Sequence, residues 1–333
     1  IENGDSVMKK LIIAAPILSG ILWGSTGLFV RSLAGMGMNS LTIMFSRVFL
    51  AMFMLLIGIL LYDRSLLKIK IRDLWIFIAA GLIGTLGLNF CYNESISRLT
   101  LSLSAVLLSL APVFVLLMAA VFFKEKITVK KFGCMILAIF GCALVSGIFE
   151  ETSAMQWSAL GLFIGVLSGF FYALYSIFSR IAMERGYHAL TITFYCIFLI
   201  AAVLVPFADW NSIGHVLALN PAKNGILMFL HSLFASVLPY VLYTLSLNYM
   251  ETGKASILAS AEPVAAMLFG LFFFSEIPTP LSLAGLALTI TALALLSLPD
   301  KNTAAADACE AGSPHEMPSA ADVEKTDIEQ KPE

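Results

Sequence analysis

Two charged side chains lie inside apolar segments of this 333-residue chain, where they could bind a substrate or move a proton. At 1.5 Å per helical residue, Arg47 lies about 12 Å from the nearer end of its segment. Glu262 lies near the middle of another segment. A charge at such depth in a membrane costs roughly 2.5 to 3.5 kcal/mol, so each should face a cavity or a partner. Glu262 would exchange a proton or bind an amine, and Arg47 would anchor a carboxylate or act as counter-ion. The alternative is that both are structural charges that hold their helices in place.

A histidine and two prolines add to these candidates. His231 lies about 10 Å inside its segment at the same rise per residue, and its imidazole could titrate near neutral pH or simply pack and hydrogen-bond. Pro112 and Pro263 interrupt the backbone hydrogen bonds of apolar helices, which frees carbonyl groups that can line a transport site or produce only a kink. Ser109 precedes Pro112 in the same segment.

Aromatic and amide side chains could coat the same cavity, although tyrosines also gather at membrane interfaces. They fall toward the two ends of their segments: Trp23, Asn89 and Tyr92 toward one end, and Tyr172, Tyr175, Tyr240 and Tyr243 toward the other. The complete set of candidate cavity residues is Trp23, Arg47, Asn89, Tyr92, Ser109, Pro112, Tyr172, Tyr175, His231, Tyr243, Glu262 and Pro263.

An internal duplication organises the segments that must position these residues. Residues 107–125 and 258–276 share eight of nineteen identities at a constant offset of 151, and residues 41–50 and 190–199 share six of ten at an offset of 149. At these offsets Tyr92 falls on Tyr243, whereas Arg47 falls on a cysteine. One unit is therefore used twice between about residues 11 and 297. Tyr92 and Tyr243 lie at opposite depths, as two alternating gates would require.

The composition is that of an integral membrane protein. Hydrophobic residues make up 59% of the chain and charged residues 13%, with a mean hydropathy of +0.91, whereas soluble domains are about 45 to 50% apolar. The five cysteines have no metal-ligand spacing, so we expect no metal, no disulfide framework and no cofactor. No nucleic-acid-binding pattern is present.

The hydropathy predicts an all-α membrane protein with ten transmembrane helices, arranged as two inverted five-helix repeats. The spans fall at 10–30, 40–62, 73–93, 99–123, 129–148, 157–180, 188–207, 224–245, 254–274 and 280–298. An odd number of spans in each copy makes the second copy enter the membrane from the opposite side. We expect residues 1–9 to be an N-terminal cytoplasmic segment, 10–148 the first repeat and 157–298 the second. Residues 299–333 are expected to form a disordered acidic cytoplasmic tail.

The lysines and arginines set the orientation. With the N-terminus inside, fourteen of those near the membrane surfaces lie inside and three outside. Both termini are therefore expected in the cytoplasm of a multi-pass protein of the plasma (inner) membrane.

The doubled pattern resembles the EamA family of the drug/metabolite transporter superfamily over about residues 11 to 297. The resemblance rests on Trp23-Gly24, Phe45-Ser46-Arg47, the turns at Pro112 and Pro263, and the helix-ending glutamates Glu125 and Glu276. It implies a ten-helix carrier with a central cavity, commonly an exporter of amino acids or other small metabolites. We interpret the two glutamates as structural groups that cap neighbouring helix N-termini.

Three functions remain open. The leading one is a secondary-active transporter, a probable exporter, that moves small metabolites by alternating access, with protons as a candidate coupling ion and lipid as its surroundings. The second is a passive channel or facilitator. The third is an intramembrane hydrolase. An HExxH motif, a pair of aspartates within the membrane or a lysine within the membrane would indicate one, and the sequence contains none of these. We therefore expect that the protein is not an enzyme. The sequence indicates neither a particular substrate nor an oligomeric state.

Overall fold

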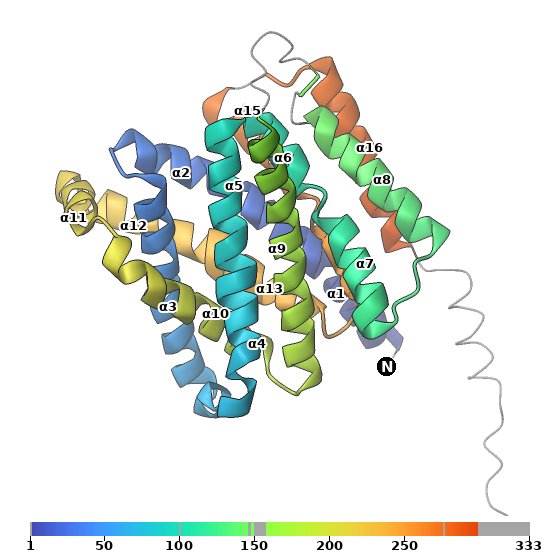
Figure 1. The fold of residues 1–333 in the computed structure, drawn as a ribbon, viewed down its shortest axis with the longest axis horizontal. Coiled ribbons are helices and arrows are strands. Elements are labelled where there is room, and N and C mark those ends of the chain that lie inside the picture. Colours follow the sequence, from blue (N-terminus) through green and yellow to red (C-terminus); the bar gives the residue numbers. More distant parts are fainter. Residues whose placement is uncertain (1, 100, 146–147, 150–157, 276, 299–333) are drawn as a thin grey trace, which may run out of the picture. The chain divides into compact units, whose positions relative to one another are not determined.

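The computed structural model describes residues 2–99, 101–145, 148–149, 158–275 and 277–298, and every regular element within them is helical (Figure 1). The described residues up to Leu296 form one compact unit, and Ser297 and Leu298 fall outside it. The expected acidic tail and Glu276 lie outside the described residues. In chain order the elements are α1 (Glu2–Gly24), α2 (Thr26–Gly35), α3 (Ser40–Tyr62), η1 (Arg64–Leu67), η2 (Ile71–Asp73), α4 (Leu74–Ile78), η3 (Ala79–Leu86), α5 (Gly87–Arg98), α6 (Leu101–Leu108), α7 (Ala111–Phe123), α8 (Val129–Val145), α9 (Ala159–Glu184), α10 (Ala189–Leu204), η4 (Val205–Phe207), α11 (Trp210–Leu219), α12 (Pro221–Ser232), η5 (Leu233–Val237), α13 (Leu238–Ser246), α14 (Thr252–Ala259), α15 (Glu262–Phe274) and α16 (Pro280–Ser297).

Nine helical runs among these residues are long and apolar enough to cross a membrane. They are Ile13–Gly35, Ser40–Tyr62, Ile71–Ile96, Ser104–Phe123, Ala159–Glu184, Ala189–Phe207, Pro221–Ser246, Thr252–Phe274 and Pro280–Ser297. The remaining expected span, 129–148, corresponds to α8, which has 17 residues. The chain is thus a multi-pass, all-helical membrane protein across the part that the structure describes.

One helix was not anticipated from the sequence. α11 lies in the connection that follows η4, and its N-terminus is capped by the side chain of Asp209, which accepts a hydrogen bond from the Ser212 amide at 3.1 Å. Val216 is buried, whereas Trp210 is half exposed. This helix of 10 residues packs against α3. It is too short to form a long apolar run, so the hydropathy pattern did not predict it.

The two duplicated segments are broken at equivalent points. α6 ends at Leu108 and α7 begins at Ala111, and α14 ends at Ala259 and α15 begins at Glu262. Pro112 and Pro263 therefore occupy the first turn of α7 and α15, where a missing amide proton breaks no helical bond. The sequence had placed these prolines within continuous spans. Both second helices end at a left-handed residue, Lys124 and Ser275, each with φ of 55°.

The helix contacts come in exchanged pairs. α1 packs against α13, α14 and α15 of the second half, and α9 packs against α5, α6 and α7 of the first half. Likewise α3 contacts η5 while α10 contacts η3, and α3 and α10 contact each other. Thus, when two helices from different halves contact each other, the equivalent helices of the opposite halves also contact each other.

Two glycines allow the closest of these approaches. A Cβ atom on Gly24 of α1 would lie 2.6 Å from the Glu262 carbonyl oxygen, and one on Gly84 of η3 would lie 2.7 Å from the Tyr175 amide nitrogen. Small residues permit such backbone contact between membrane helices. Both glycines bring a helix against a candidate site residue.

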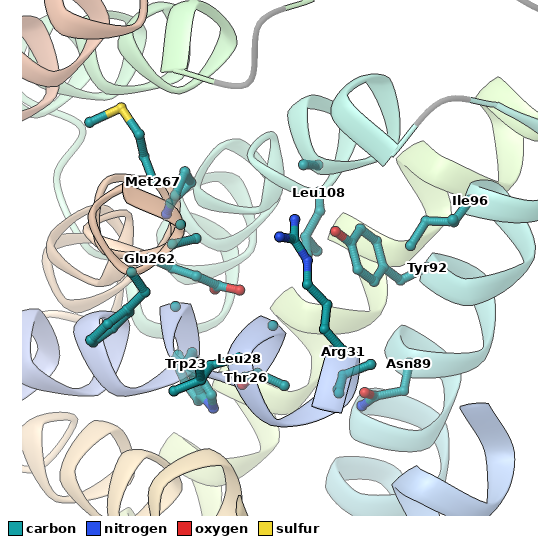
Figure 2. Close-up of a pocket in the computed structure, with 18 of the residues that line it drawn as sticks. Trp23, Thr26, Leu28, Arg31, Asn89, Tyr92, Ile96, Leu108, Glu262 and Met267 are labelled. Atoms are coloured by element: carbon teal, nitrogen blue, oxygen red, sulfur yellow. The ribbon is translucent and has the colours of Figure 1, made fainter. Parts of the chain in front are cut away.

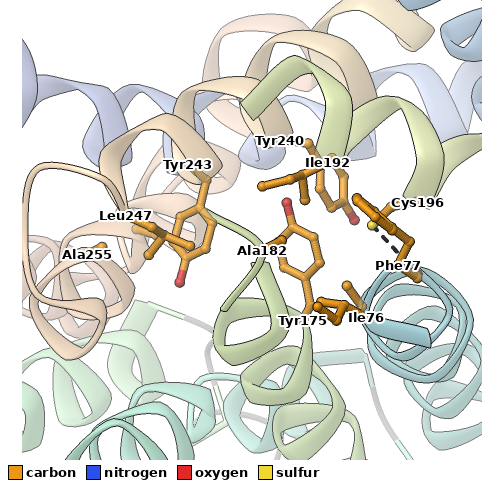
Figure 3. Close-up of a cluster of buried hydrophobic side chains, with 12 residues drawn as sticks. Ile76, Phe77, Tyr175, Ala182, Ile192, Cys196, Tyr240, Tyr243, Leu247 and Ala255 are labelled. Atoms are coloured by element: carbon orange, nitrogen blue, oxygen red, sulfur yellow. Dashed lines mark hydrogen bonds between the residues drawn. The ribbon is translucent and has the colours of Figure 1, made fainter. Parts of the chain in front are cut away.

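A cluster of buried side chains joins α4, η3, α9, α10, α13 and α14 (Figure 3). Tyr175, Tyr243, Leu247 and Ile192 in it are at most 1% exposed. The Tyr175 hydroxyl and the Thr244 hydroxyl are 2.7 Å apart. This core joins the two halves of the chain.

Candidate functional site

A cavity of about 660 Å³ lies between the two halves of the chain. Its wall includes residues of α1, α2, α3, α5, α9, α12, α13 and α15. Figure 2 shows the carboxyl group of Glu262, the guanidinium group of Arg31 and the ring of Tyr92 directed into it. Nine of the twelve sequence-predicted residues line this cavity: Trp23, Arg47, Asn89, Tyr92, Tyr172, Tyr175, His231, Glu262 and Pro263.

One part of the wall is a basic and polar cluster. The Arg47 guanidinium of α3 donates a hydrogen bond from Nη2 to Oδ1 of Asn89 at 3.4 Å, and its buried Nε has no partner among the described residues. Both ring nitrogens of His231 are also buried without a partner there, while its ring stacks on Phe29 with centroids 5.4 Å apart. Buried polar atoms are normally satisfied, so these three nitrogens are exceptions in the wall of the cavity.

Glu262 contributes the acidic group from the first residue of α15. Within the described residues its carboxylate takes part in no hydrogen bond or ion pair. The ionisable groups that interact with it electrostatically lie on four other helices, and they are Tyr92, Cys142, Tyr172 and Tyr240. Among the described residues that line the cavity, Glu262 is the one acid, and Arg47 and Arg31 are the arginines.

An aromatic layer separates the cavity from the buried cluster. Trp23 packs edge-on against Tyr240 and Tyr172, with centroids 5.2 and 6.2 Å apart. Trp23 also lies 5.6 Å from Tyr243, which is fully buried and 2.8 Å from the Ser176 hydroxyl. Offset and edge-on aromatic contacts of this kind stabilise one another. The layer closes the cavity toward the side on which Tyr243 lies.

Three predicted residues lie away from the cavity wall. Tyr243 lies beneath the aromatic layer. The Ser109 hydroxyl donates to the Ala105 carbonyl at 2.9 Å, and Pro112 is buried in the first turn of α7. The expected interruption at Pro112 is present as the break between α6 and α7, but neither residue borders the cavity.

Arg31 is a cavity residue that the sequence reasoning did not include. It extends from α2 into the cavity and stacks over the ring of Phe274 at 4.8 Å. The sequence held one signal for it, because Arg31 and Arg180 occupy equivalent positions at the offset of 149. Its position near the end of a span had suggested only a surface charge.

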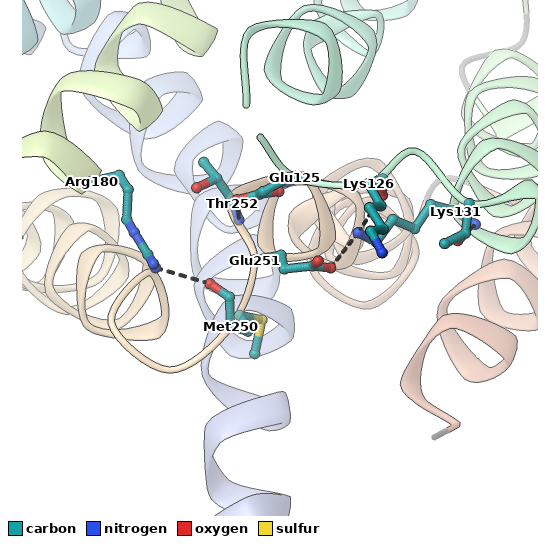
Figure 4. Close-up of polar contacts among 9 residues, drawn as sticks. Glu125, Lys126, Lys131, Arg180, Met250, Glu251 and Thr252 are labelled. Carbon is teal, nitrogen blue, oxygen red and sulfur yellow. Dashed lines mark hydrogen bonds and ion pairs between the residues drawn. The ribbon is translucent and has the colours of Figure 1, made fainter. Parts of the chain in front are cut away.

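Glu125 has the structural role expected for it. Its two carboxylate oxygens accept the backbone amides of Thr252 and Gly253 at 2.7 and 3.1 Å, which caps the N-terminus of α14. Lys131 forms an ion pair with Glu251 in the same turn (Figure 4). The capping prediction is therefore confirmed for Glu125.

The donor set does not resemble a metal centre. No group of three or more histidine, cysteine, aspartate or glutamate residues comes together in the described part of the chain. The four cysteines described are buried and separate. The arrangement instead combines an aromatic wall with opposite charges, which suits an organic solute.

The long apolar helices define a multi-pass membrane protein, and they surround a largely apolar cavity with a few polar and charged groups. Residues 9–147 and 159–298 match the EamA-like transporter family, once in each half. The chain belongs to the EamA-like transporter family, within the drug/metabolite transporter superfamily, and it is a transporter rather than an enzyme.

Named relatives and a solved structure agree with this assignment. An "Uncharacterized transporter" of Archaeoglobus fulgidus is 28% identical over 83% of this chain and 93% of its own length. The pseudopaline exporter CntI of Pseudomonas aeruginosa is 26% identical over 66% of this chain and 74% of its own. A crystal structure with 14% identity superposes with a TM-score of 0.70 over 85% of this chain and 95% of that chain, which supports the fold.

Proposed function

We propose that this protein is a secondary-active exporter that moves small metabolites carrying both a carboxylate and an amine by alternating access. In this proposal the chain forms ten spans as two inverted repeats, residues 10–148 and 157–298, in the plasma membrane. Both termini and the acidic tail, residues 299–333, lie in the cytoplasm. The match to the EamA-like transporter family supports the transporter role.

The observation that best supports alternating access is that residues at equivalent positions in the two halves differ in their exposure. Four residues that line the cavity have counterparts that are fully buried. The pairs are Val30 and Ser179, Tyr92 and Tyr243, Ile96 and Leu247, and Ala266 and Val115, and the second member of each is at most 1% exposed. Because the two halves share one folding pattern, exchanging their conformations would close this cavity and open its counterpart at the other end.

Two further features support equivalent repeats related by an approximate two-fold axis, and an odd number of spans in each repeat would then invert the second. The contacts between the halves are exchanged in pairs, as an approximate two-fold axis requires. The left-handed residues Lys124 and Ser275 end equivalent helices, 151 residues apart, with the same φ. Independent helices would have no reason to repeat such details.

The charges of the cavity indicate the substrate class. Arg47, with Asn89 and His231 beside it, offers donors for a carboxylate. Glu262 offers an acceptor for an amine and can also carry a proton. Trp23 and Tyr172 provide an apolar surface for the remainder of the molecule. We place the coupling proton on Glu262, because no other acid lies at that depth.

The decisive experiment is a substrate screen in proteoliposomes with an imposed pH gradient. Saturable uptake of amino acids or related zwitterions, accelerated by the gradient and competed by unlabelled substrate, supports the carrier. Counterflow driven by substrate alone distinguishes a carrier from a passive channel, which would show neither saturation nor counterflow. The outward direction is supported by the name of one relative, an exporter.

The inverted arrangement has its own test. Single cysteines at Phe149 and Leu298, which are 53% and 57% exposed, lie at the ends of the two repeats. The proposal places them on opposite sides of the membrane, so an impermeant maleimide applied to intact cells should label only Phe149→Cys. Labelling of both from one side would overturn the inversion.

A further inference from the structure

A second pocket, of about 440 Å³, lies between the loop after α3 and the turn between α9 and α10. Both segments lie near the lower edge of Figure 1. Lys68 and Lys70 line the pocket from the loop, and Arg185 and His188 line it from the turn. None of the residues that line this pocket lines the transport cavity, so the two are separate.

Hydrogen bonds hold the two walls of this pocket together. The Lys70 amide donates to the Tyr187 hydroxyl at 3.1 Å, and the Thr191 hydroxyl donates to the Leu66 carbonyl at 2.8 Å. The Tyr187 hydroxyl in turn donates to the Asp73 carboxylate at 2.7 Å. The fold itself therefore sets the positions of the walls, and a ligand would meet a site that is already formed.

The wall of the pocket carries positive charge, and no described residue that lines it is an acid. The ammonium groups of Lys68 and Lys70 take part in no hydrogen bond or ion pair with the described residues. The Arg185 guanidinium pairs with Asp73, which uses part of its five donors. Asp63 interacts electrostatically with Lys68, but its two oxygens already accept the amide and hydroxyl of the residue two positions on. The cations therefore outnumber the acids at this pocket.

A phosphate group is the anion that suits this set of donors. Lysines bind phosphate as point charges, and an arginine binds it through a planar fork of N–H groups. His188 adds a donor, because its Nδ1 accepts the Leu190 amide at 3.2 Å and Nε2 then carries the ring proton. These donors come from both walls, so they would surround a tetrahedral group rather than contact one side of it.

An exposed apolar strip beside the pocket indicates that the phosphate belongs to a lipid. Ile71, Trp75 and Ile78 follow one another at helical spacing along η2 and α4, and Ile71 is 89% exposed while Trp75 is half exposed. Exposed side chains of this kind contact lipid in a membrane protein, and tryptophan is typical of the interface with the headgroups. Arg185 lines the pocket and stacks over the Trp75 ring at 5.6 Å, so the pocket and the strip adjoin.

We propose that this pocket binds a phosphate group, and that the source of the phosphate is the headgroup of an anionic lipid. The acyl chains of the bound lipid lie along the strip of Ile71, Trp75 and Ile78. The lipid joins a loop of the first half of the chain to a turn of the second half, and it stabilises their contact. In the proposed orientation this loop faces the cytoplasm, where anionic lipids attract basic groups. Binding itself does not depend on that orientation or on transport.

Native mass spectrometry of the full chain tests the lipid directly. The protein is titrated in neutral detergent with phosphatidylglycerol and, separately, with phosphatidylcholine, and bound lipids are counted. We expect one phosphatidylglycerol to bind in preference to phosphatidylcholine. A basic group near a membrane surface contributes about fivefold in affinity, so Lys68→Gln and Lys70→Gln should each weaken binding by about fivefold, and by more when combined. Equal binding of the two lipids, or binding that the combined substitution leaves unchanged, would overturn the lipid as the source.

The matched control removes the same charge from the same loop. Arg64 and Arg72 are exposed there but do not line the pocket. Arg64→Gln combined with Arg72→Gln should therefore leave the preference for phosphatidylglycerol nearly unchanged. An equal loss in the two double variants would overturn the pocket, because it would indicate a general attraction of the basic loop for anions.

Thermal unfolding in detergent separates a lipid from a soluble anion. A ligand that binds only the folded protein raises the melting temperature. Phosphatidylglycerol should raise it in the parent and in the arginine control, but not in the combined variant of Lys68 and Lys70. Without lipid the three proteins should unfold at the same temperature, because the substituted side chains are exposed.

Inorganic phosphate, compared with sodium chloride at the same ionic strength, provides the second arm. A rise with phosphate alone that the lysine substitutions remove supports the phosphate site and assigns it to a soluble anion. No response to either ligand overturns the proposal. Transport enters neither measurement, so failure of this site and failure of the carrier are distinguishable.

Discussion

Glu125 and Thr252, 127 residues apart, are joined by a 2.7 Å hydrogen bond from the Thr252 amide to the Glu125 carboxylate. The acceptor follows α7 in the first half and the donor begins α14 in the second half. A helix N-terminus has unpaired amides and a partial positive charge, so a carboxylate there satisfies both. The two halves are thereby held together between the end of α7 and the start of α14 by a contact that the sequence anticipated.

Removing this cap should destabilise the protein without altering the cavity. Glu125→Ala leaves the Thr252 and Gly253 amides unpaired, and we expect a loss of about 1 to 2 kcal/mol, typical of helix caps. Glu125→Gln keeps one acceptor and should lose less. Thermal unfolding in detergent measures the effect, with Glu184→Gln, at an exposed ion pair with Arg180, as a control expected to change stability little. An unchanged melting temperature for Glu125→Ala would contradict the structural role.

Glu262→Gln should remove the pH dependence of transport while the protein still inserts and folds. The amide has the shape of the carboxyl group but cannot exchange a proton. Flux in proteoliposomes with and without a pH gradient measures the effect. Unchanged coupling in the variant would reject the proton role of Glu262.

Arg47→Gln should weaken binding of substrates that carry a carboxylate. Loss of one charge-assisted hydrogen bond corresponds to about 1.5 to 3 kcal/mol, or roughly ten- to hundredfold in KM. Arg47→Lys keeps the charge but not the two-pronged geometry, so it should lie between. Substrate esters, which lack the carboxylate, provide the control because their transport should not respond to the substitution. Equal losses for acids and esters would instead indicate a structural charge.

Gly24→Ala should disturb the contact of α1 with α15. The added Cβ would lie 2.6 Å from the Glu262 carbonyl oxygen, so the helices must separate, at a cost of about 1 to 3 kcal/mol for overpacking. Gly27→Ala is a close control, because no atom lies within 4 Å of the position that its Cβ would take. Melting temperatures of the two variants should differ clearly. Equal stabilities would show that α1 can shift without cost.

Much of the site was predictable because charge is rare in apolar segments. Arg47 and Glu262 stood out on that ground, and both line the cavity. Arg31 did not stand out, because a charge near the end of a span is ordinary, although its side chain lines the cavity from α2. The interruption at Pro112 was expected from the proline, whereas the absence of Ser109 and Pro112 from the cavity wall depends on how α6 and α7 pack.

The amino-acid sequence by itself determined the membrane class, the family and the duplication, because hydropathy and repeated identities are properties of the chain alone. Only the tertiary structure decided which copy of each repeated residue borders the cavity and which is buried. Tyr92 and Tyr243 have the same chemistry and equivalent positions, yet one lines the cavity and the other is covered by an aromatic layer. Residue type and spacing do not encode this choice, because it depends on which helices pack against each copy.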